Sequence, residues 1–323
     1  MMAFSGFSRP ARHSTTKAAQ EPCSVDCVVY SDDQVLEKGL SLLGVGSERL
    51  GRKAKLRRFL SDFGKEPSVY ASVWKHLQTT SLPAAQVKHP TEEDFARFLW
   101  TMYWFNHYPN ENHMANRTGW CDKTVREFLW TYIEKLSLLS TEKIVWKDEW
   151  THPGPKTPKF ILSVDGIHCP IEEPTAGHKY AKNTKYYSHK FETAGLSYEV
   201  ALSVWTSEVA WVNGPYPAGK GDREIFREAL ASKIPSGRKV IADSAYLSQD
   251  LPMLRGVYNA DTHKVRLFKR RVRMRHESFF GKMHVFDVLT KKFRHGEAKH
   301  ALVFRACVLI CAHQIDLVPL FDP

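Results

Sequence analysis

The chain has 323 residues, enough for two domains or one large one. Its 46 Lys and Arg residues against 35 Asp and Glu give a net charge of +11, which favours an anionic partner, most commonly nucleic acid, although any basic globular protein fits the charge alone. No apolar stretch is predicted to span a membrane, and six cysteines without a CxxC pair argue against a disulfide framework, so we expect a folded protein from a reducing compartment.

The N-terminal segment, residues 1–38, is polar and aperiodic, which predicts a disordered tail. A basic run follows, and it fits a nuclear import signal or a DNA-facing patch: Arg49, Arg52, Lys53, Lys55, Arg57 and Arg58. Taken by itself, such a run is more typical of a solvated helix face.

Residues 39–150 are predicted to form a helical domain. Thr91 followed by three acidic residues indicates a helix start. Further on, Gly119 can form a tight turn between two helices, the second capped by Asp122, which is the pattern of a helix-turn-helix. In that interpretation Lys123, Thr124 and Arg126 face a DNA groove; the alternative is an ordinary helical hairpin.

Three prolines between 140 and 158 indicate a domain boundary, and an α/β pattern starts at residue 159. Strands are expected at 160–164, near 186–191, at 196–204 by strict alternation, at 209–212 and at 239–242. A glycine- and proline-rich loop is expected at 213–221, with Asp222 capping the helix after it. This order predicts a ribonuclease-H-like domain over 159–323, a mixed five-stranded sheet flanked by helices.

Two acids end apolar strands of this predicted sheet, Asp165 after 160–164 and Asp243 after 239–242. Acids at strand ends lie where α/β sheets bind ligands. Glu277 lies on the face of a later helix opposite its apolar stripe and can join them. Three converging carboxylates can hold two divalent ions, which together cut phosphodiester bonds. For each acid alone, a helix cap or a solvated position is the simpler interpretation.

The segment 264–275 carries seven basic residues in twelve, which predicts a track for a phosphate backbone. Its interleaved apolar residues, Val265, Leu267 and Val272, suggest a strand or extended edge and not a disordered tail. The side chains expected to contact DNA in and after this segment are Lys269, Arg270, Arg271, Arg273, Arg275, Lys282 and His284.

Three motifs carry a family resemblance: Ser-Val-Asp-Gly at 163–166, Val-Ile-Ala-Asp-Ser-Ala-Tyr at 240–246 and Arg-His-Glu-Ser-Phe at 275–279. With them, residues 159–323 resemble the catalytic domain of DDE-superfamily transposases, most closely the Harbinger-like group. The helical region before them is similar to the N-terminal helix-turn-helix of that family, by a less specific pattern.

The resemblance implies that Asp165, Asp243 and Glu277 bind two Mg²⁺ or Mn²⁺ ions and that the protein cleaves and joins DNA at the ends of a mobile element. It implies double-stranded DNA as partner, both terminal inverted repeats and target DNA, and a nuclear location. A homo-oligomer and a Myb-like accessory protein are candidate partners, and no membrane is expected.

Two features depart from the family pattern. His284 stands seven residues after Glu277, where many members have a Lys or Arg that grips DNA, and the interval from Asp243 to Glu277 is short. Two alternatives therefore stay open beside the transposase: a domesticated DNA-binding protein without cutting activity, and a ribonuclease-H-fold repair nuclease.

Overall fold

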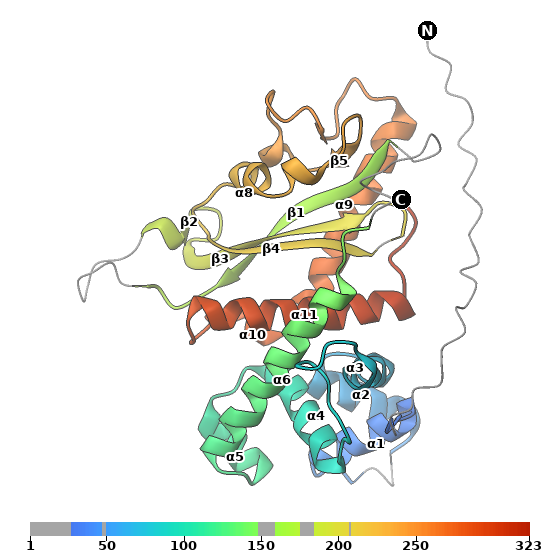
Figure 1. The fold of residues 1–323 in the computed structure, drawn as a ribbon, viewed down its shortest axis with the longest axis vertical. Coiled ribbons are helices and arrows are strands. Elements are labelled where there is room, and N and C mark those ends of the chain that lie inside the picture. The colour runs from blue at the N-terminus through green and yellow to red at the C-terminus, as the bar shows by residue number, and fades with distance from the viewer. Residues whose placement is uncertain (1–26, 47–49, 148–158, 175–183, 207) are drawn as a thin grey trace.

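The computed structural model describes residues 27–46, 50–147, 159–174, 184–206 and 208–323 (Figure 1). Most of the predicted tail lies outside these ranges. Its last residues, however, form the start of helix α1 (Asp32–Leu42), so the predicted boundary at 38 is too late. Ser31 and Gln34 form a reciprocal capping box that begins this helix, a local signal that the polar composition obscures.

The N-terminal part is helical, as predicted. After α1 come α2 (Arg52–Phe63), α3 (Pro67–Thr79), α4 (Glu92–His107), α5 (Glu111–Thr118) and α6 (Asp122–Lys143). The Thr91 side chain accepts a hydrogen bond from the Asp94 amide and the Asp94 carboxylate accepts one from the Thr91 amide, so α4 begins where the sequence predicts. Almost every residue of α4 from Phe95 to Asn106 is buried, which makes it the central helix of this part.

The C-terminal part contains a mixed sheet built around one long strand, β1 (Phe160–Pro170). β1 pairs antiparallel with β3 and parallel with β5, β3 pairs antiparallel with β4, and β5 pairs parallel with β6. The short β2 (Tyr187–Ser188) adds to the start of β3. The remaining strands are β3 (Thr193–Ser203), β4 (Val209–Pro217), β5 (Lys239–Ile241) and β6 (Leu254–Arg255).

The order β4-β3-β1-β5-β6, with three antiparallel strands followed by two parallel ones, is the ribonuclease-H-like arrangement predicted from the sequence. Four details differ from the prediction. The strand expected near 186–191 is reduced to the two residues of β2, and β6 was not expected. In addition, β1 continues six residues past the expected end at 164, and β4 runs through most of the predicted loop at 213–221. These last two differences have one cause: β3 offers a paired partner along its whole length, and that partner overrides the local Gly and Pro signals.

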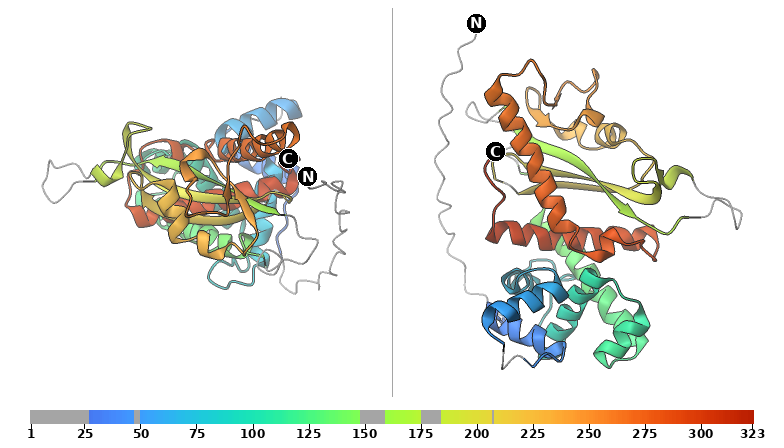
Figure 2. Two further views of the ribbon diagram at one scale, coloured as in Figure 1. Left: turned by 90° about the horizontal axis from the view of Figure 1, so that it is seen from above. Right: turned by 180° about the vertical axis from the view of Figure 1, so that it is seen from behind.

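Helices cover both faces of the sheet. On one face α8 (Asp222–Glu228) packs Phe226 against Leu162 and Val164 of β1. On the other, α9 (His263–Met283) crosses the sheet diagonally, as the view from behind shows (Figure 2), and packs Val272 against Ile241. The short turns and helices between them are η2 (Thr184–Tyr186), η3 (Ala231–Lys233), η4 (Ser244–Tyr246) and α10 (Asp287–Thr290).

The last helix, α11 (Glu297–Leu317), lies between the sheet and the N-terminal helices (Figure 1). It packs against α6 and α3 on one side and against β4 on the other, so one hydrophobic core runs through both parts of the chain. Its length and composition would also suit a membrane span, contrary to the sequence prediction that no stretch is long enough. However, 67% of that apolar window is buried inside the protein, as in a core helix.

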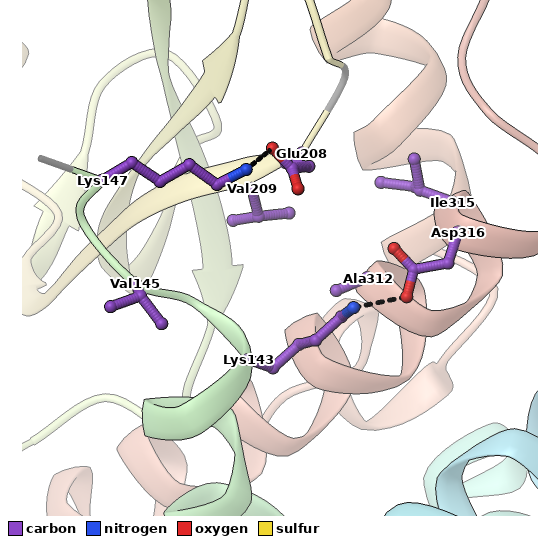
Figure 3. Close-up of a pocket in the computed structure, with 8 residues that line it drawn as sticks. All are labelled: Lys143, Val145, Lys147, Glu208, Val209, Ala312, Ile315 and Asp316. Carbon is purple, nitrogen blue, oxygen red and sulfur yellow. Dashed lines mark hydrogen bonds and ion pairs between the residues drawn. The ribbon is translucent and has the colours of Figure 1, made fainter. Parts of the chain in front are cut away.

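Ion pairs close the junction between the two parts. Lys143 at the end of α6 pairs with Asp316 of α11, and Lys147 pairs with Glu208 before β4 at 2.6 Å (Figure 3). These residues line a small pocket with Val145, Val209, Ala312 and Ile315, and none of the predicted site residues lies in it. The predicted domain boundary follows directly, but residues 148–158 lie outside the described ranges.

Candidate active site

Asp165 lies inside β1, not at its end, and its backbone is paired with Val200 of β3. Side chains alternate along a strand, so Asp165 shares a face with Ser163, whose hydroxyl is 2.9 Å from His276 Nε2 of α9. The Gly166 amide donates to Asp165 Oδ1 at 2.9 Å. Burial, helped by the charges of Asp243 and Asp222, raises the pKa of Asp165 to about 6 against this hydrogen bond and the charge of Arg273.

Asp243 follows β5 and caps the turn η4, where its Oδ1 accepts hydrogen bonds from the Ala245 amide at 2.7 Å and the Ser244 hydroxyl at 3.1 Å. Arg273 of α9 pairs with its other oxygen at 2.9 Å. Burial acts to raise the pKa of Asp243, but the Ala245 amide and the Arg273 charge outweigh it, and the pKa is lowered. Because the charge of Asp243 raises the pKa of Asp165, these two predicted strand acids lie close enough for their charges to interact.

Glu277 lies on α9, one helical turn after Arg273, so the two side chains share a helix face. Its side chain is exposed, as are Gly281 and His284 on the predicted outer face. It forms no hydrogen bond or ion pair with a described residue, while the guanidinium of Arg273 occupies Asp243. The structure thus brings Asp165 and Asp243 together and leaves Glu277 at the edge of the site.

The predicted basic track is helical, not extended, because it forms the first half of α9. The sequence does not show the apolar period of a helix here, because two of the residues on the buried face of α9 are charged. Lys269 is 2% exposed and pairs with Asp261 at 2.8 Å, and Arg275 is 1% exposed and donates to the Val204 carbonyl. The prediction that these two contact DNA is therefore corrected: they anchor α9 to neighbouring segments.

Other basic residues of the track are exposed at positions that DNA can reach. Arg270 and Arg271 are exposed, and Lys282 is half-exposed with its backbone carbonyl accepting a hydrogen bond from Lys65 at 2.5 Å. Arg273 is half-exposed but is engaged by Asp243.

The predicted helix-turn-helix is formed by α5 and α6, with Gly119 in the left-handed conformation at φ +77 between them. Cys121, and not Asp122, is the cap residue of α6. Lys123 is exposed and pairs with Glu127 of α6 at 3.9 Å, and Arg126 pairs with Glu111 of α5 through its Nε and Nη2 atoms. The hairpin therefore holds two of its three predicted DNA contacts in internal ion pairs, and its role in binding DNA stays a prediction.

Two residues beside the acids, Asp222 and Lys190, are not predicted from the sequence to belong to the site. Asp222, expected to cap α8, is instead the first residue of that helix after the cap Gly221, and its Oδ1 approaches β1 at Gly166. Burial raises the pKa of Asp222; the charge of Lys190 opposes this shift and that of Asp243 adds to it. Lys190 also acts on Asp243, so an exposed lysine from the segment before β3 stands near both acids. No periodic or motif signal marks either residue.

The acids fit a divalent cation by their chemistry, since Mg²⁺ and Mn²⁺ prefer carboxylate oxygens. The pKa of Asp165 is raised, and the carboxylates of Asp222 and Glu277 form no hydrogen bond or ion pair with any described residue, so all three have room for a cation. In the described part of the chain, however, no three His, Cys, Asp or Glu side chains already lie in position around one ion. Binding a metal would require the Arg273–Asp243 pair to open.

One comparison with known proteins supports the predicted family. Residues 164–312 match the family model described as DDE superfamily endonuclease. This part of the chain, just under half of it, is similar to a DDE-superfamily endonuclease domain. The match covers β1 with Asp165, the turn with Asp243, and α9 with Glu277, so the predicted resemblance is confirmed at the level of the superfamily. The Harbinger-like subgroup stays a prediction.

Other comparisons add little to the DDE assignment. A search of curated proteins finds no match. Among solved structures, one similar chain comes from a structure described as a pre-cleavage Mos1 transpososome, with 8% identity over 87% of this chain and 95% of that one. Its TM-score of 0.25 is too low to carry an argument about this protein. The fold assignment depends on the strand order, which the paired strands give directly.

Proposed function

We propose that the protein is a DNA endonuclease of the transposase type, which cleaves and joins phosphodiester bonds with two divalent metal ions held by Asp165, Asp243 and Glu277. The observation that carries this proposal is the approach of Asp165 and Asp243 on adjacent strands of a DDE endonuclease domain. Such ions, when bound, would activate the attacking oxygen and stabilise the leaving one.

The chain's own groups would prepare the acids for this task. The amides of Gly166 and Ala245 each hold one oxygen of Asp165 and of Asp243, which leaves the second oxygen of Asp165 for another ligand, whereas the second oxygen of Asp243 is held by Arg273. Arg273 neutralises Asp243 in the described arrangement and would have to release it. Glu277, one turn away on the same helix face, is exposed and would be the acid that completes the site.

DNA is the proposed partner because the net charge is +11 and exposed basic residues such as Arg270 and Arg271 lie on α9 with Glu277. The nucleus is accordingly the proposed location. A complex containing more than one copy of the chain is part of this proposal. An accessory Myb-like protein stays a prediction from the family resemblance.

The test uses a supercoiled plasmid that carries the genomic flanks of the gene, incubated with the protein and Mg²⁺ or Mn²⁺. We expect metal-dependent nicking or cleavage by the unaltered protein and none by Asp165→Ala. The matched control is Asp250→Ala, which removes a surface acid paired with Arg227. Equal cleavage by the Asp165 variant and the unaltered protein would rule out the proposed site.

One observation favours a second candidate, a DNA-binding protein that no longer cuts. The Arg273–Asp243 pair occupies one of the acids, and His284, the cap residue after α9, stands where the family resemblance leads us to expect a Lys or Arg. Burial also lowers the pKa of His284, so its imidazole is neutral at pH 7. This candidate predicts salt-dependent binding of the same flanking DNA without cleavage under any metal condition.

A further inference from the structure

Asp222 reaches β1 at the one position beside Asp165 where the strand has no side chain. Successive residues of a strand point to opposite faces, so Gly166 faces α8 while Asp165 faces α9. A Cβ atom at Gly166 would lie 2.8 Å from Asp222 Oδ1 and 3.4 Å from its Cγ. Any other residue at 166 would therefore push the Asp222 carboxylate away from the strand.

The position of Asp222 is not explained by helix capping or by an ion pair. Gly221 is the cap residue of α8 and makes no side-chain hydrogen bond. The Asp222 side chain is half-buried, yet it forms no hydrogen bond or ion pair with any residue in the described ranges. A carboxylate that loses part of its water normally acquires a positive partner, because uncompensated burial of charge is costly.

Two buried polar atoms beside Asp222 also have no partner among the described residues. The Tyr246 hydroxyl, on a side chain only 1% exposed, lies 3.6 Å from the same Cβ position at Gly166. Glu199, also 1% exposed, uses Oε1 to accept from Trp211 at 3.1 Å and leaves Oε2 unpaired. Buried polar atoms without partners are rare and mark a place where a ligand, ion or water belongs. The Tyr246 hydroxyl lies at the gap that Asp222 enters, and Glu199 is the cross-strand partner of Gly166, so its side chain is on the same face of the sheet.

No described strand pairs with β1 on the β5 side beyond Ser163, so Asp222 from the α8 face and Asp165 from the α9 face can meet at this open edge. We propose that Asp222 is a further metal-binding carboxylate of the site formed by Asp165 and Asp243 and that Gly166 admits it to β1. This inference rests on the proposed two-metal function. Two divalent ions carry four positive charges, and the three predicted acids supply only three negative ones. Asp222 supplies the fourth, which favours the fully loaded site.

The test measures Mn²⁺ binding to the full chain by electron paramagnetic resonance, without DNA and without any activity readout. Asp222→Asn removes the charge at nearly constant shape, and Gly166→Ala leaves every acid in place but blocks the approach of Asp222. We expect each change to weaken Mn²⁺ binding by roughly tenfold or more. The matched control is Glu224→Gln, an exposed acid on the same helix, which should bind Mn²⁺ as the unaltered protein does.

Thermal unfolding in metal-free buffer shows whether each variant is folded, and Asp222→Asn decides the question if Gly166→Ala is not. Asp165→Asn is measured in parallel to separate this inference from the proposed function. Weaker binding by Asp165→Asn together with unchanged binding by Asp222→Asn would overturn the role of Asp222 alone. Unchanged binding by both variants, or no binding by the unaltered protein, would overturn the proposed function as well.

Discussion

Replacing His300 with Gln should flatten the dependence of stability on pH below neutrality. His300 is on α11, fully buried, with its ring stacked on Tyr198 at 5.5 Å and in edge contact with Phe293 at 4.7 Å. Its Nδ1 lies 2.7 Å from the Tyr198 hydroxyl, and its Nε2 has no partner among the described residues. Burial lowers the pKa of His300 to about 3, because the charged imidazolium would lose its water.

The sign follows from where the proton binds. His300 stays neutral in the folded protein, whereas in the unfolded chain it takes up a proton below its ordinary pKa of 6.5. Its contribution to stability is therefore complete above pH 6.5 and is lost as the pH falls towards 3. One proton taken up on unfolding changes the free energy of unfolding by about 1.4 kcal/mol per pH unit. Between neutrality and pH 5 the loss is about 2 kcal/mol.

The assay is urea unfolding at several pH values between about 7.5 and 5, followed by circular dichroism. The plot of unfolding free energy against pH should be less steep for His300→Gln than for the unaltered protein by about 1.4 kcal/mol per pH unit below 6.5. Tyr198→Phe is the control, since it removes the hydrogen bond and keeps the buried imidazole, so its slope should match that of the unaltered protein. Equal slopes for His300→Gln and the unaltered protein would refute the reasoning, whatever their absolute stabilities.

Three further predictions concern the sheet, the site and the junction. Gly195→Ala should destabilise the fold by about 1–3 kcal/mol in urea unfolding, because the new Cβ would lie 2.1 Å from His168 Cε1 and 2.8 Å from the Cys169 carbonyl; full stability would mean that the sheet yields there. Arg273→Gln should tighten Mn²⁺ binding in calorimetry, since it frees Asp243 from its ion pair, and unchanged affinity would show that the pair does not compete with metal. Leu136→Ala shortens a fully buried side chain of α6 and should lower the free energy of unfolding by about 2–5 kcal/mol. The helix and sheet signals of this variant should be lost together in a single unfolding transition, and two separate transitions would contradict a core shared by both parts.

Local patterns predicted much of the fold. The alternation at 196–204 predicted β3, the apolar runs before Asp165 and Asp243 predicted β1 and β5, and the cap at Thr91 predicted α4. Such signals survive because they depend on neighbours along the chain. The start of α9 was misread as a strand because Lys269 and Arg275 occupy buried helix positions, which removes the apolar period that marks a helix.

The candidate site, like the fold, could be predicted from the sequence only in part. The sequence by itself determined the resemblance to the DDE superfamily, since the motifs around Asp165, Asp243 and Glu277 predicted an endonuclease domain of this kind, which the family match bears out. Only the tertiary structure decided how those acids are engaged: Arg273 holds Asp243, Glu277 stays exposed, and Asp222 enters through the gap at Gly166. These contacts join residues from strands and helices far apart in the chain, and their energies depend on burial and distance, which no local pattern records.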